Sequence, residues 1–422
     1  MRATRRVSTV VPPRRGPYAE LNDGDIAQFE RILGSKNVLT SDLDPYNVDW
    51  MKWFKGSSSC VLFPTSAEEV SKVLGHCFSR RLAVVPQSGN TGLVGGSIPV
   101  YDEVVLSLRK LNSHYQFESQ SGVLECDSGF ILEELDNRLA SEGYMVPLDL
   151  GAKGSCLIGG NISTGAGGLR LIRFGSLHNH LLGLQVVSLS SFEKCREIVR
   201  LSKDRLGEVL SALEIIDEES MCCVLEDASF HKIFSSDHPF YILLETIGSD
   251  EYHDQEKLAN FLNEAMDRGL LADGVQACSR EEASYMWRIR EAVPVALVRS
   301  GYVFKHDVSL PLQHFYTLTE AVKHRLAMEG LKARVFTFGH IGDGNSHLNV
   351  VTKEYSPDVA DELYPFIYDW VVTHDGSISA EHGIGQLKKP FMAFGKGVEI
   401  EIAKRLKKVF DPSHILSPYK MF

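Results

Sequence analysis

LAVVPQSGNTGLVGGS, residues 82–97, carries the strongest indication of how this chain folds. The apolar run at 82–86 is typical of a buried strand, and it leads directly into a loop with glycine at positions 89, 92, 95 and 96. Upstream, CVLF (60–63) predicts a short strand, and a capping box at 66–69 begins a helix with apolar residues at helical spacing. Strand, helix, strand and glycine-rich loop in succession predict an α/β beginning.

A second glycine-rich stretch, GAKGSCLIGGNISTGAGGLR (151–170), follows a predicted strand at 121–127 and a predicted helix bearing Leu132, Leu135 and Leu139. Glycine permits positive φ and lets backbone N–H groups approach a ligand closely. Either loop alone could be a tight connection between strands, whereas two in one small domain favour an extended cofactor that carries phosphates. Neither loop has the Rossmann pattern G-x-G-x-x-G opening a helix, so a dinucleotide bound in a non-Rossmann manner fits best.

The candidate cofactor-binding residues of these two loops are glycines and small polar residues. They are Ser88, Gly89, Asn90, Thr91, Gly92, Gly95, Ser97, Gly160, Asn161, Thr164, Gly167 and Gly168. The hydroxyl and amide side chains would add hydrogen-bonding groups to the backbone N–H groups that face phosphate oxygens.

Composition limits the classes of function. With 422 residues the chain is long enough for two or three domains and for more than one hydrophobic core. A net charge of −11 opposes binding to nucleic acid or to an anionic membrane, and no apolar run approaches the roughly 20 residues that span a bilayer. Eight cysteines are scattered without a C-x-x-C pair, which predicts free thiols in a reducing compartment.

The first 20 residues, MRATRRVSTVVPPRRGPYAE, contain five arginines, and no acidic residue precedes Glu20. An arginine-rich, acid-poor segment with hydroxyl residues is typical of a mitochondrial transit peptide. The alternative is a disordered basic tail that targets nothing. The composition favours import.

The pattern changes at about residue 188. Predicted amphipathic helices at 192–206, 252–268 and 313–329 alternate with apolar strands such as EVLSALEII (208–216) and FYILLETI (240–247). Helices layered on an antiparallel sheet fit this order. We therefore expect an α+β chain with a first domain at 46–187, whose last strand is LLGLQVV (181–187), and a second domain at 188–422.

Two short stretches, GHIGDGNSHLNV (339–350) and SISAEHGIG (377–385), bring histidines and a glutamate into the second domain. His340, His347 and Glu381 have the ligand types and number of a catalytic zinc site with open positions. A strand at 346–350 would point His347 and Asn349 to the same face, with the Gly-Asp-Gly turn folding His340 back toward it. Asp343 could orient a ligating imidazole. The alternative is a structural or solvent-exposed histidine pair.

Further groups suit a reaction on an acidic substrate. His382 adjoins Glu381 and could take a proton from a group bound to the metal. Arg288, Arg290 and Lys305 could meet carboxylates, although a surface ion pair or a solvated charge is the alternative for each.

Seven stretches together match one known family: NVDWMKWFKG, PQSGNTGLVGGSIPV, PLDLGAKGSCLIGGNISTGAGGLRLIRFGSLH, GYVFKHDVSLP, GHIGDGNSHLN, SAEHGIG and DPSHILSPYK. The chain resembles the FAD-linked 2-hydroxy-acid dehydrogenases of the vanillyl-alcohol-oxidase fold. PLDLGAKGSC and FKHDVSLP are most similar to the members that act on D-2-hydroxyglutarate, with D-lactate or D-malate as alternative substrates.

The resemblance implies a PCMH-type FAD-binding domain followed by a substrate- and metal-binding domain with a C-terminal segment. It implies FAD along the two glycine loops and zinc held by His340, His347 and Glu381. Arg290 and Lys305 would meet the substrate carboxylates, Asn349 would contact the substrate, and His382 would both contact it and act as the base. D-2-hydroxyglutarate would be oxidised to 2-oxoglutarate, with electrons passing from FAD to electron-transfer flavoprotein in the mitochondrial matrix.

One large departure from the family occurs at Val187-Ser188. In relatives the LGLQVV strand continues through a hairpin, and a second flavin-contacting motif of the type G-S-E-G-T-L-G follows several tens of residues later. Here Val187 runs directly into SLSSFEKC (188–195), which matches the opening of the substrate domain. We expect an incomplete FAD domain with FAD affinity strongly reduced or lost, as in a catalytically impaired splice-type isoform.

Overall fold

A computed structural model describes residues 13–120, 122–168, 183–394 and 397–421. The chain divides into two compact units: unit 1 comprises Met1–Val146, Ala152–Ala166 and His382–Phe422, and unit 2 comprises Pro147–Gly151 and Gly167–Glu381. Residues 1–12 of the predicted transit segment, and LRLIRFGSLH (169–178) of the family motifs, lie outside the described residues. Among the helices of the described ranges, none combines the length and hydrophobicity needed to cross a bilayer.

The elements of unit 1 are mostly short. In chain order they are α1 (Asp23–Leu33), η1 (Ser35–Asn37), β1 (Val38–Leu39), α2 (Asp44–Asn47), β2 (Val61–Leu62), α3 (Ala67–Arg80), β3 (Val84–Gln87), β4 (Val104–Ser107), η2 (Leu108–Lys110), β5 (Tyr115–Glu118), β6 (Val123–Cys126), α4 (Leu132–Ala140), α5 (Ile158–Thr164), η4 (Lys389–Phe394) and α13 (Gly397–Phe410).

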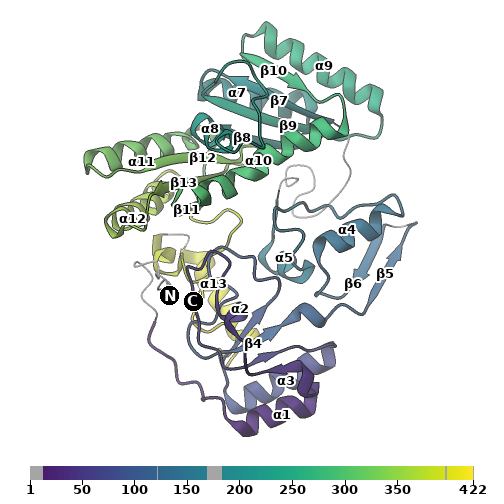
Figure 1. The fold of residues 1–422 in the computed structure, drawn as a ribbon, viewed down its shortest axis with the longest axis vertical. Helices are drawn as coiled ribbons and strands as arrows, with labels where there is room; N and C mark the ends of the chain where they lie inside the picture. Colours follow the sequence, from purple (N-terminus) through teal and green to yellow (C-terminus); the bar gives the residue numbers. More distant parts are fainter. Residues whose placement is uncertain (1–12, 121, 169–182, 395–396, 422) are drawn as a thin grey trace. The chain divides into compact units, whose positions relative to one another are not determined.

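The first sheet of unit 1 confirms the α/β beginning. Its strand order is β1-β2-β4-β3, with β2, β4 and β3 parallel and β1 antiparallel to β2. Helices α1 and α3 lie beside this sheet (Figure 1). They bury Phe29, Val73 and Cys77 against Val84 and Val104. Ser66 accepts a hydrogen bond from the Glu69 N–H and begins α3, but the Glu69 carboxylate accepts from the Thr65 N–H, so the predicted capping box is only half formed.

The second sheet of unit 1 has only two strands in the described residues. Strands β5 and β6 pair antiparallel, and residues of intermediate burial alternate with exposed ones along both. Val123 is 58% exposed. An isolated two-stranded ribbon is marginally stable in water, and three or more strands are normally needed to bury a face. Among the described residues no third strand pairs with this ribbon.

The ends of the chain belong to unit 1. Val84 of β3 donates its N–H to the Ile415 carbonyl and accepts from the Ser417 N–H, so the C-terminal tail lies along the sheet edge. The predicted second domain at 188–422 differs from the structure here, because residues from His382 onward pack with unit 1.

The described part of the predicted transit segment, residues 13–20, is packed as well. Arg15 makes two hydrogen bonds to the Asp102 carboxylate, at 2.9 and 2.7 Å, and the Gly16 N–H donates to the Tyr419 hydroxyl. These residues therefore contribute to unit 1, unlike the removable segment that composition predicts for residues 1–20 as a whole.

Unit 2 is built from long elements. In chain order they are β7 (Gly183–Leu189), α7 (Phe192–Leu206), β8 (Leu210–Asp217), α8 (Glu218–Leu225), β9 (Phe240–Thr246), α9 (Glu251–Asp267), β10 (Asp273–Gln276), α10 (Arg280–Ser300), β11 (Tyr302–Ser309), η3 (Leu312–His314), α11 (Thr317–Met328), β12 (Arg334–His340), β13 (Asn345–Thr352) and α12 (Pro357–Thr373).

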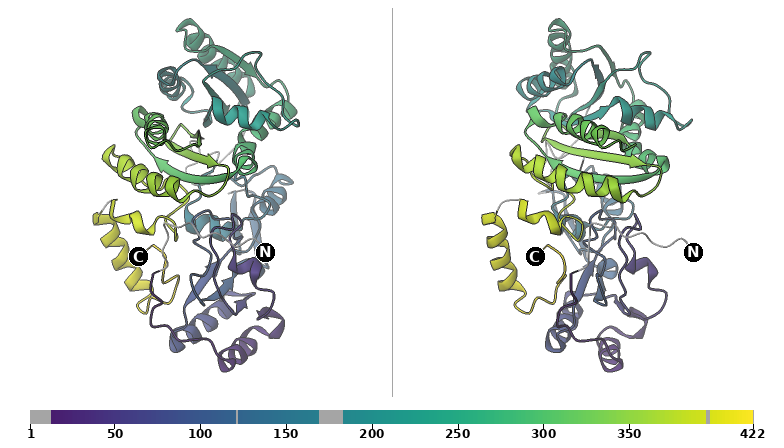
Figure 2. Two further views of the ribbon diagram at one scale, coloured as in Figure 1. Left: turned by 60° about the vertical axis from the view of Figure 1, so that its left-hand side comes forward. Right: turned by 90° about the vertical axis from the view of Figure 1, so that its left-hand side faces the viewer.

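A seven-stranded antiparallel sheet of order β10-β7-β9-β8-β12-β13-β11 forms the centre of unit 2. Helices α7 and α9 pack on one face over Leu213 and Ile215, and α8 and α10 pack on the other face over Ile216 and Phe336. Helices α11 and α12 lie together on the same face as α7 and α9, which the two views of Figure 2 display. The predicted layer of helices on an antiparallel sheet is confirmed.

Strand β7 joins this sheet, not a sheet of unit 1. It pairs with β9 and β10, with Val187 opposite Ile242 and Gly274. The predicted boundary at 187/188 therefore falls inside a strand. Because LGLQVV continues directly into SLSS, these residues form one continuous strand. Val187 packs in the core on one face of the unit 2 sheet, and Val186 packs in the core on the other face.

Candidate active site

Strands β11 and β13 place four polar side chains on one face of the unit 2 sheet. Lys305 lies directly opposite Asn349, and Asp307 lies directly opposite His347. Side chains repeat every two residues along a strand, so all four point to the same face. This is the face that carries α10, because Val303 and Val351 of the same two strands pack in the α10 core. The predicted strand at 346–350, with His347 and Asn349 on one face, is confirmed by β13.

The turn between β12 and β13 brings His340 to His347. The two Nε2 atoms lie 3.4 Å apart, and both side chains are buried. Gly344 has φ of +79°, and a Cβ there would collide with the Leu310 carbonyl oxygen, so the turn requires glycine at this position. The prediction that the Gly-Asp-Gly turn folds His340 back onto the strand face is confirmed.

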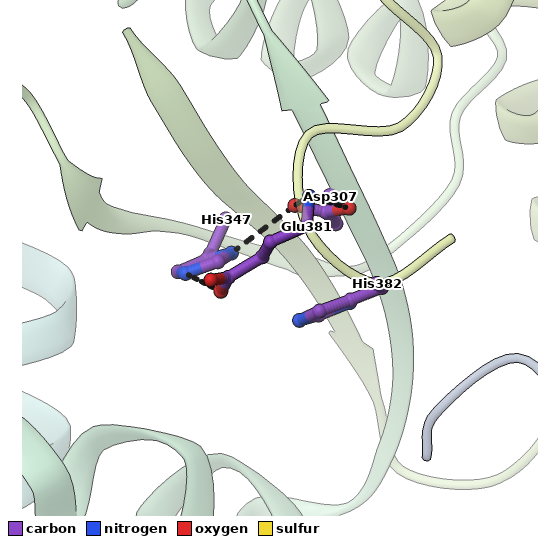
Figure 3. Close-up of side chains that lie close together, drawn as sticks. All are labelled: Asp307, His347, Glu381 and His382. Carbon is purple, nitrogen blue, oxygen red and sulfur yellow. Dashed lines mark hydrogen bonds and ion pairs between the residues drawn. The ribbon is translucent and has the colours of Figure 1, made fainter. Parts of the chain in front are cut away.

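Glu381 reaches the same point from a different segment. The Asp307 carboxylate accepts hydrogen bonds from the N–H groups of Ala380 and Glu381, both at 3.1 Å, and fixes this segment beside β11. Glu381 Oε1 then lies 3.4 Å from His340 Nε2 and 3.3 Å from His347 Nε2. Figure 3 shows Glu381 directed at His347, with dashed lines joining His347 to Glu381 and to Asp307.

These separations fit a single metal ion. Three ligand atoms bound at roughly 2.0–2.1 Å to a tetrahedral zinc ion lie about 3.3–3.4 Å from one another. The Nε2 atoms of His340 and His347 and Oε1 of Glu381 have this spacing in all three pairs. The structure thus brings the three predicted ligands together.

A looser set of possible ligand atoms overlaps the first. Asp307, His347, Glu381 and His382 each offer one atom, and these atoms lie within 4.8 Å of one another (Figure 3). Asp307 already accepts from Asn345 Nδ2 at 2.9 Å and from two backbone N–H groups, so its oxygens are engaged in holding the segment. The tighter set of His340, His347 and Glu381 is the better metal site.

Glu214 is a buried carboxylate that sequence reasoning missed. Strand β8 pairs with β12 through Phe338–Ile216 and Gly339–Ile215, and continuing this register places Glu214 opposite His340. Glu214 Oε1 lies 2.6 Å from His340 Nδ1, while Oε2 accepts from Arg290 Nε at 2.9 Å. Burial alone would raise the pKa of Glu214, but the His340 ring and the Arg290 guanidinium outweigh it and hold that pKa below its usual value.

Asp343 does not take the orienting role that its position in the turn suggests. Its Oδ1 accepts the Asn345 N–H at 3.0 Å, which closes the turn. The contact to His340 Nδ1 comes from Glu214 on a different strand. A carboxylate on Nδ1 that leaves Nε2 for the metal is the usual arrangement around ligating histidines.

The charges of these side chains favour a cation at this point. Burial alone would lower the pKa of His340, but the carboxylates of Glu214 and Glu381 outweigh it and raise that pKa to about 10. Burial alone would raise the pKa of Glu381, but the His340 and His347 rings hold it well below its usual range. A metal ion would therefore compete with a proton for His340 Nε2.

The two predicted substrate cations are both buried in unit 2. Arg290 of α10 is 4% exposed, with its guanidinium over the Phe338 ring and paired with Glu214 at 2.8 Å. Lys305 is 9% exposed, and burial lowers its pKa to about 8. Asn349 donates from Nδ2 to the His347 carbonyl. Arg288 instead lies exposed against the Tyr285 ring, so it does not join them.

The two glycine loops of unit 1 pack against each other. A Cβ at Gly89 would collide with the Ser155 carbonyl, and one at Gly160 would meet the Ser88 side chain. Nothing lies within 4 Å of a Cβ built at Gly92 or Gly165, so backbone in both loops is open to a ligand. The loops can therefore present their N–H groups to one extended, phosphate-bearing molecule, which fits the predicted dinucleotide.

The remaining predicted cofactor residues have roles in the loops themselves. Asn90, at φ of +57°, donates to the Val48 carbonyl and accepts from the Ser97 hydroxyl. The Thr164 hydroxyl donates to the Gly160 carbonyl near the end of α5. Asn161 and the glycines at 95, 167 and 168 are buried, Ser88 is partly buried, and Thr91 is partly exposed. Arg109, which sequence reasoning missed, donates to the Gly89 carbonyl.

Comparison with protein families accounts for both units. Residues 58–191 match the family described as "FAD binding domain", and residues 184–421 match "FAD linked oxidases, C-terminal domain". The mitochondrial D-2-hydroxyglutarate dehydrogenase of Arabidopsis thaliana is 42% identical over 97% of this chain and 83% of its own length. The chain belongs to the D-2-hydroxyglutarate dehydrogenase family. The predicted family is thus confirmed.

Other members of the D-2-hydroxyglutarate dehydrogenase family are similar along the same length. The mitochondrial enzyme of Rattus norvegicus is 38% identical over 97% of this chain and 86% of its own. The D-2-hydroxyglutarate–pyruvate transhydrogenase of Saccharomyces cerevisiae is 35% identical, with 96% of each chain covered.

Solved structures of low identity share the fold. P-cresol methylhydroxylase superposes with a TM-score of 0.71 at 14% identity, covering 95% of this chain and 97% of that one. Alkyldihydroxyacetonephosphate synthase gives 0.72 at 11% identity, covering 98% and 87%. The vanillyl-alcohol-oxidase fold, with a PCMH-type FAD-binding domain before an α+β domain, is confirmed.

The alignments also bear on the predicted loss of sequence. The alignment with the Arabidopsis protein is 469 positions long, but only 97% of this 422-residue chain is available to fill it. Several tens of positions in the relative therefore have no counterpart here. The two family matches overlap at residues 184–191, the region of strand β7. No residue therefore separates the FAD-binding match from the C-terminal match.

Proposed function

We propose that this chain has the site of a zinc-dependent D-2-hydroxyglutarate dehydrogenase, which oxidises the 2-hydroxy acid to 2-oxoglutarate with FAD as hydride acceptor. The observation that carries the proposal is the set of three ligand atoms at mutual distances of 3.3–3.4 Å on the strand face that holds Lys305 and Asn349. The family supports the substrate, because its relatives carry that name.

The roles of the chain's own residues follow from their positions. His340, His347 and Glu381 would hold the metal ion, and Arg290 and Lys305 would neutralise the two carboxylates of the substrate. Asn349, opposite Lys305, would contact the substrate from the same face. His382 follows Glu381 and would take the hydroxyl proton. When bound, the metal ion supplies Lewis acidity and FAD supplies the hydride acceptor.

Turnover of D-2-hydroxyglutarate with an artificial electron acceptor tests this function. D-lactate and D-malate are the competing substrates. Two buried cations should favour a substrate with two carboxylates, so kcat/KM should be higher for D-2-hydroxyglutarate and D-malate than for D-lactate. A preference for D-lactate would contradict the proposed roles of Arg290 and Lys305.

We further propose that this protein works in the mitochondrial matrix and that electron-transfer flavoprotein accepts the electrons from its flavin. Relatives from Arabidopsis and rat are named mitochondrial, and residues 1–20 have transit-peptide composition. Because residues 13–20 pack in unit 1, an import cleavage that preserves the fold would fall within residues 1–12.

A second candidate function is a form that holds metal and dicarboxylate but no flavin. Two observations favour it: the β5–β6 ribbon has only two strands among the described residues, and several tens of positions of the Arabidopsis relative have no counterpart here. Strand β7, at the end of the FAD-binding family match, pairs in the unit 2 sheet.

Purified protein is therefore expected to carry much less than one FAD per chain, because an incomplete sheet cannot fix one side of the cofactor. The measurement is the flavin absorbance band at about 450 nm, taken with added FAD and after dialysis. Zinc content serves as the control, since all three ligands lie in unit 2 and should be unaffected. A full stoichiometric yellow band would contradict the prediction and favour the working dehydrogenase.

Dicarboxylate binding is expected to weaken as pH rises through about 8. Burial lowers the pKa of Lys305 to that value, so its charge is present below pH 8 and is lost above it. The Kd of 2-oxoglutarate, measured by calorimetry on the zinc-loaded protein, should rise up to about tenfold per pH unit above pH 8. Lys305→Arg should bind with little change over the same range, since its guanidinium stays charged. An equal rise in that variant would assign the titration to another group.

A further inference from the structure

Glu214 joins the metal site to the substrate-binding arginine. Its two oxygens contact different partners. Oε1 lies 2.6 Å from His340 Nδ1, and Oε2 lies 2.9 Å from Arg290 Nε and 2.8 Å from a terminal nitrogen of Arg290. All three side chains are almost wholly buried. A buried carboxylate flanked by two donors fixes both of them in one geometry.

We propose that Glu214 is a positioning residue that sets His340 for the metal ion and Arg290 for the substrate carboxylate at the same time. The inference rests on the proposed function, because it assigns the two partners their roles there. His340 must donate from Nδ1 to Glu214, which leaves its Nε2 lone pair directed at the point between His347 and Glu381. Arg290 gives its Nε and one terminal nitrogen to Glu214 and keeps its other terminal nitrogen for a ligand.

The donor pattern makes glutamine an informative replacement at this position. A glutamate offers acceptors on both sides, whereas a glutamine offers one acceptor and one NH₂ donor. With its NH₂ toward His340, the ring would have to accept at Nδ1 and carry its proton on Nε2, where it cannot bind metal. With its NH₂ toward Arg290, two donors would face each other and displace the guanidinium. Glu214→Gln therefore cannot satisfy both partners, although it keeps shape and volume.

Glu245 provides a matched control in the neighbouring strand β9. It is also buried in the sheet, and its oxygens accept from the Trp287 ring N–H at 2.8 Å and from the Ser211 hydroxyl at 2.7 Å. A hydroxyl can reverse and accept from an amide, so Glu245→Gln can keep both of these bonds. It removes a buried carboxylate from the same sheet without opposing a second donor to either Trp287 or Ser211.

The test measures two affinities on the full chain: zinc, titrated against a chromophoric chelator, and 2-oxoglutarate, by calorimetry at saturating zinc. In Glu214→Gln we expect zinc affinity to fall about 10- to 100-fold, or 2-oxoglutarate affinity to fall at least tenfold if the amide turns its NH₂ to Arg290. Glu245→Gln should stay within about twofold of the unmodified chain in both. Both affinities unchanged in Glu214→Gln would overturn the inference.

A double variant separates positioning from a loss of folding. In Glu214→Gln with Arg290→Met, the amide can turn its oxygen to His340 because no guanidinium opposes its NH₂. Zinc affinity should then match that of Arg290→Met alone, while 2-oxoglutarate affinity stays low in both. A double variant that binds zinc more weakly than Arg290→Met would overturn the positioning role. A third variant, His347→Ala, tests the proposed function separately. Zinc binding that survives this change would contradict the proposed set of metal ligands.

Discussion

Replacing His347 by alanine is expected to remove the metal ion from this protein. His347 Nε2 is one corner of the triangle formed with His340 Nε2 and Glu381 Oε1, at 3.4 and 3.3 Å. Two ligands on a buried face hold zinc far less tightly than three, because a divalent ion needs most of its coordination from the protein there. Zinc per chain, measured by mass spectrometry after dialysis, should fall from about one to under about 0.1.

Activity should fall with the metal. Polarisation of the substrate oxygen by the ion contributes several kcal/mol, so kcat/KM for D-2-hydroxyglutarate should decrease by about 10³-fold or more on flavin-loaded protein. His324→Ala, on the exposed side of α11, removes an imidazole away from the site and should retain both zinc and activity. Zinc retained in full by His347→Ala would mean that the ion, if any, binds elsewhere.

The arrangement of the candidate metal ligands was largely predictable from the sequence because its main features are local. An eight-residue stretch contains two histidines around a turn, and strand alternation then decides the direction of His347 and Asn349. The structure agrees at each of these points. Glu381, by contrast, lies 34 residues beyond His347. Its position beside the two histidines depends on hydrogen bonds from the Ala380 and Glu381 N–H groups to Asp307, and no local sequence pattern predicts these bonds.

Glu214 and Asp307 were missed for a common reason. Each sits inside a buried strand, Glu214 in SALEII and Asp307 in FKHDVSL, where sequence reasoning attends to apolar residues. The signal was nevertheless present, because a carboxylate in the middle of an apolar strand must have partners when it is buried. What the sequence could not supply was the identity of those partners. They come from strands β12 and β13, the 380–381 segment and helix α10.

The sheet to which the strand before Val187 belongs could not be predicted for a different reason. An apolar run such as LQVVSL suits any strand that is buried on both faces, and the backbone ladder does not depend on which side chains it carries. The periodicity predicted a strand at 181–187 correctly over its described part, but not its partners. The same holds for the C-terminal tail, whose bonds to Val84 are made by backbone groups.

The position of β7 keeps the unit 2 sheet continuous across Val187. Unit 2 keeps a continuous seven-stranded sheet because the residues before and after Val187 together make one of its strands. Unit 1 keeps its parallel sheet and both glycine loops but only a two-stranded second sheet in the described residues. The three predicted metal ligands lie in unit 2, whereas most of the predicted flavin-contacting residues lie in unit 1, so metal content and flavin content are informative as independent measurements.

Replacing His382 by asparagine is expected to abolish turnover while leaving the metal in place. Asparagine keeps a polar side chain of similar reach but cannot take a proton at neutral pH. General-base catalysis contributes about 10²- to 10⁴-fold, so kcat on flavin-loaded protein should fall by that factor, with the Kd of 2-oxoglutarate changed much less. The measurements are turnover with an artificial acceptor, and zinc content of the same preparation.

Zinc content decides between two roles for His382. Its ring atom belongs to the looser group with Asp307, His347 and Glu381, whose ligand atoms lie within 4.8 Å of one another. The tighter triangle with His340 does not include it. If His382 is the base, His382→Asn keeps about one zinc per chain and loses kcat. If zinc is lost in step with activity, His382 is a ligand, and the proton must go to a different group.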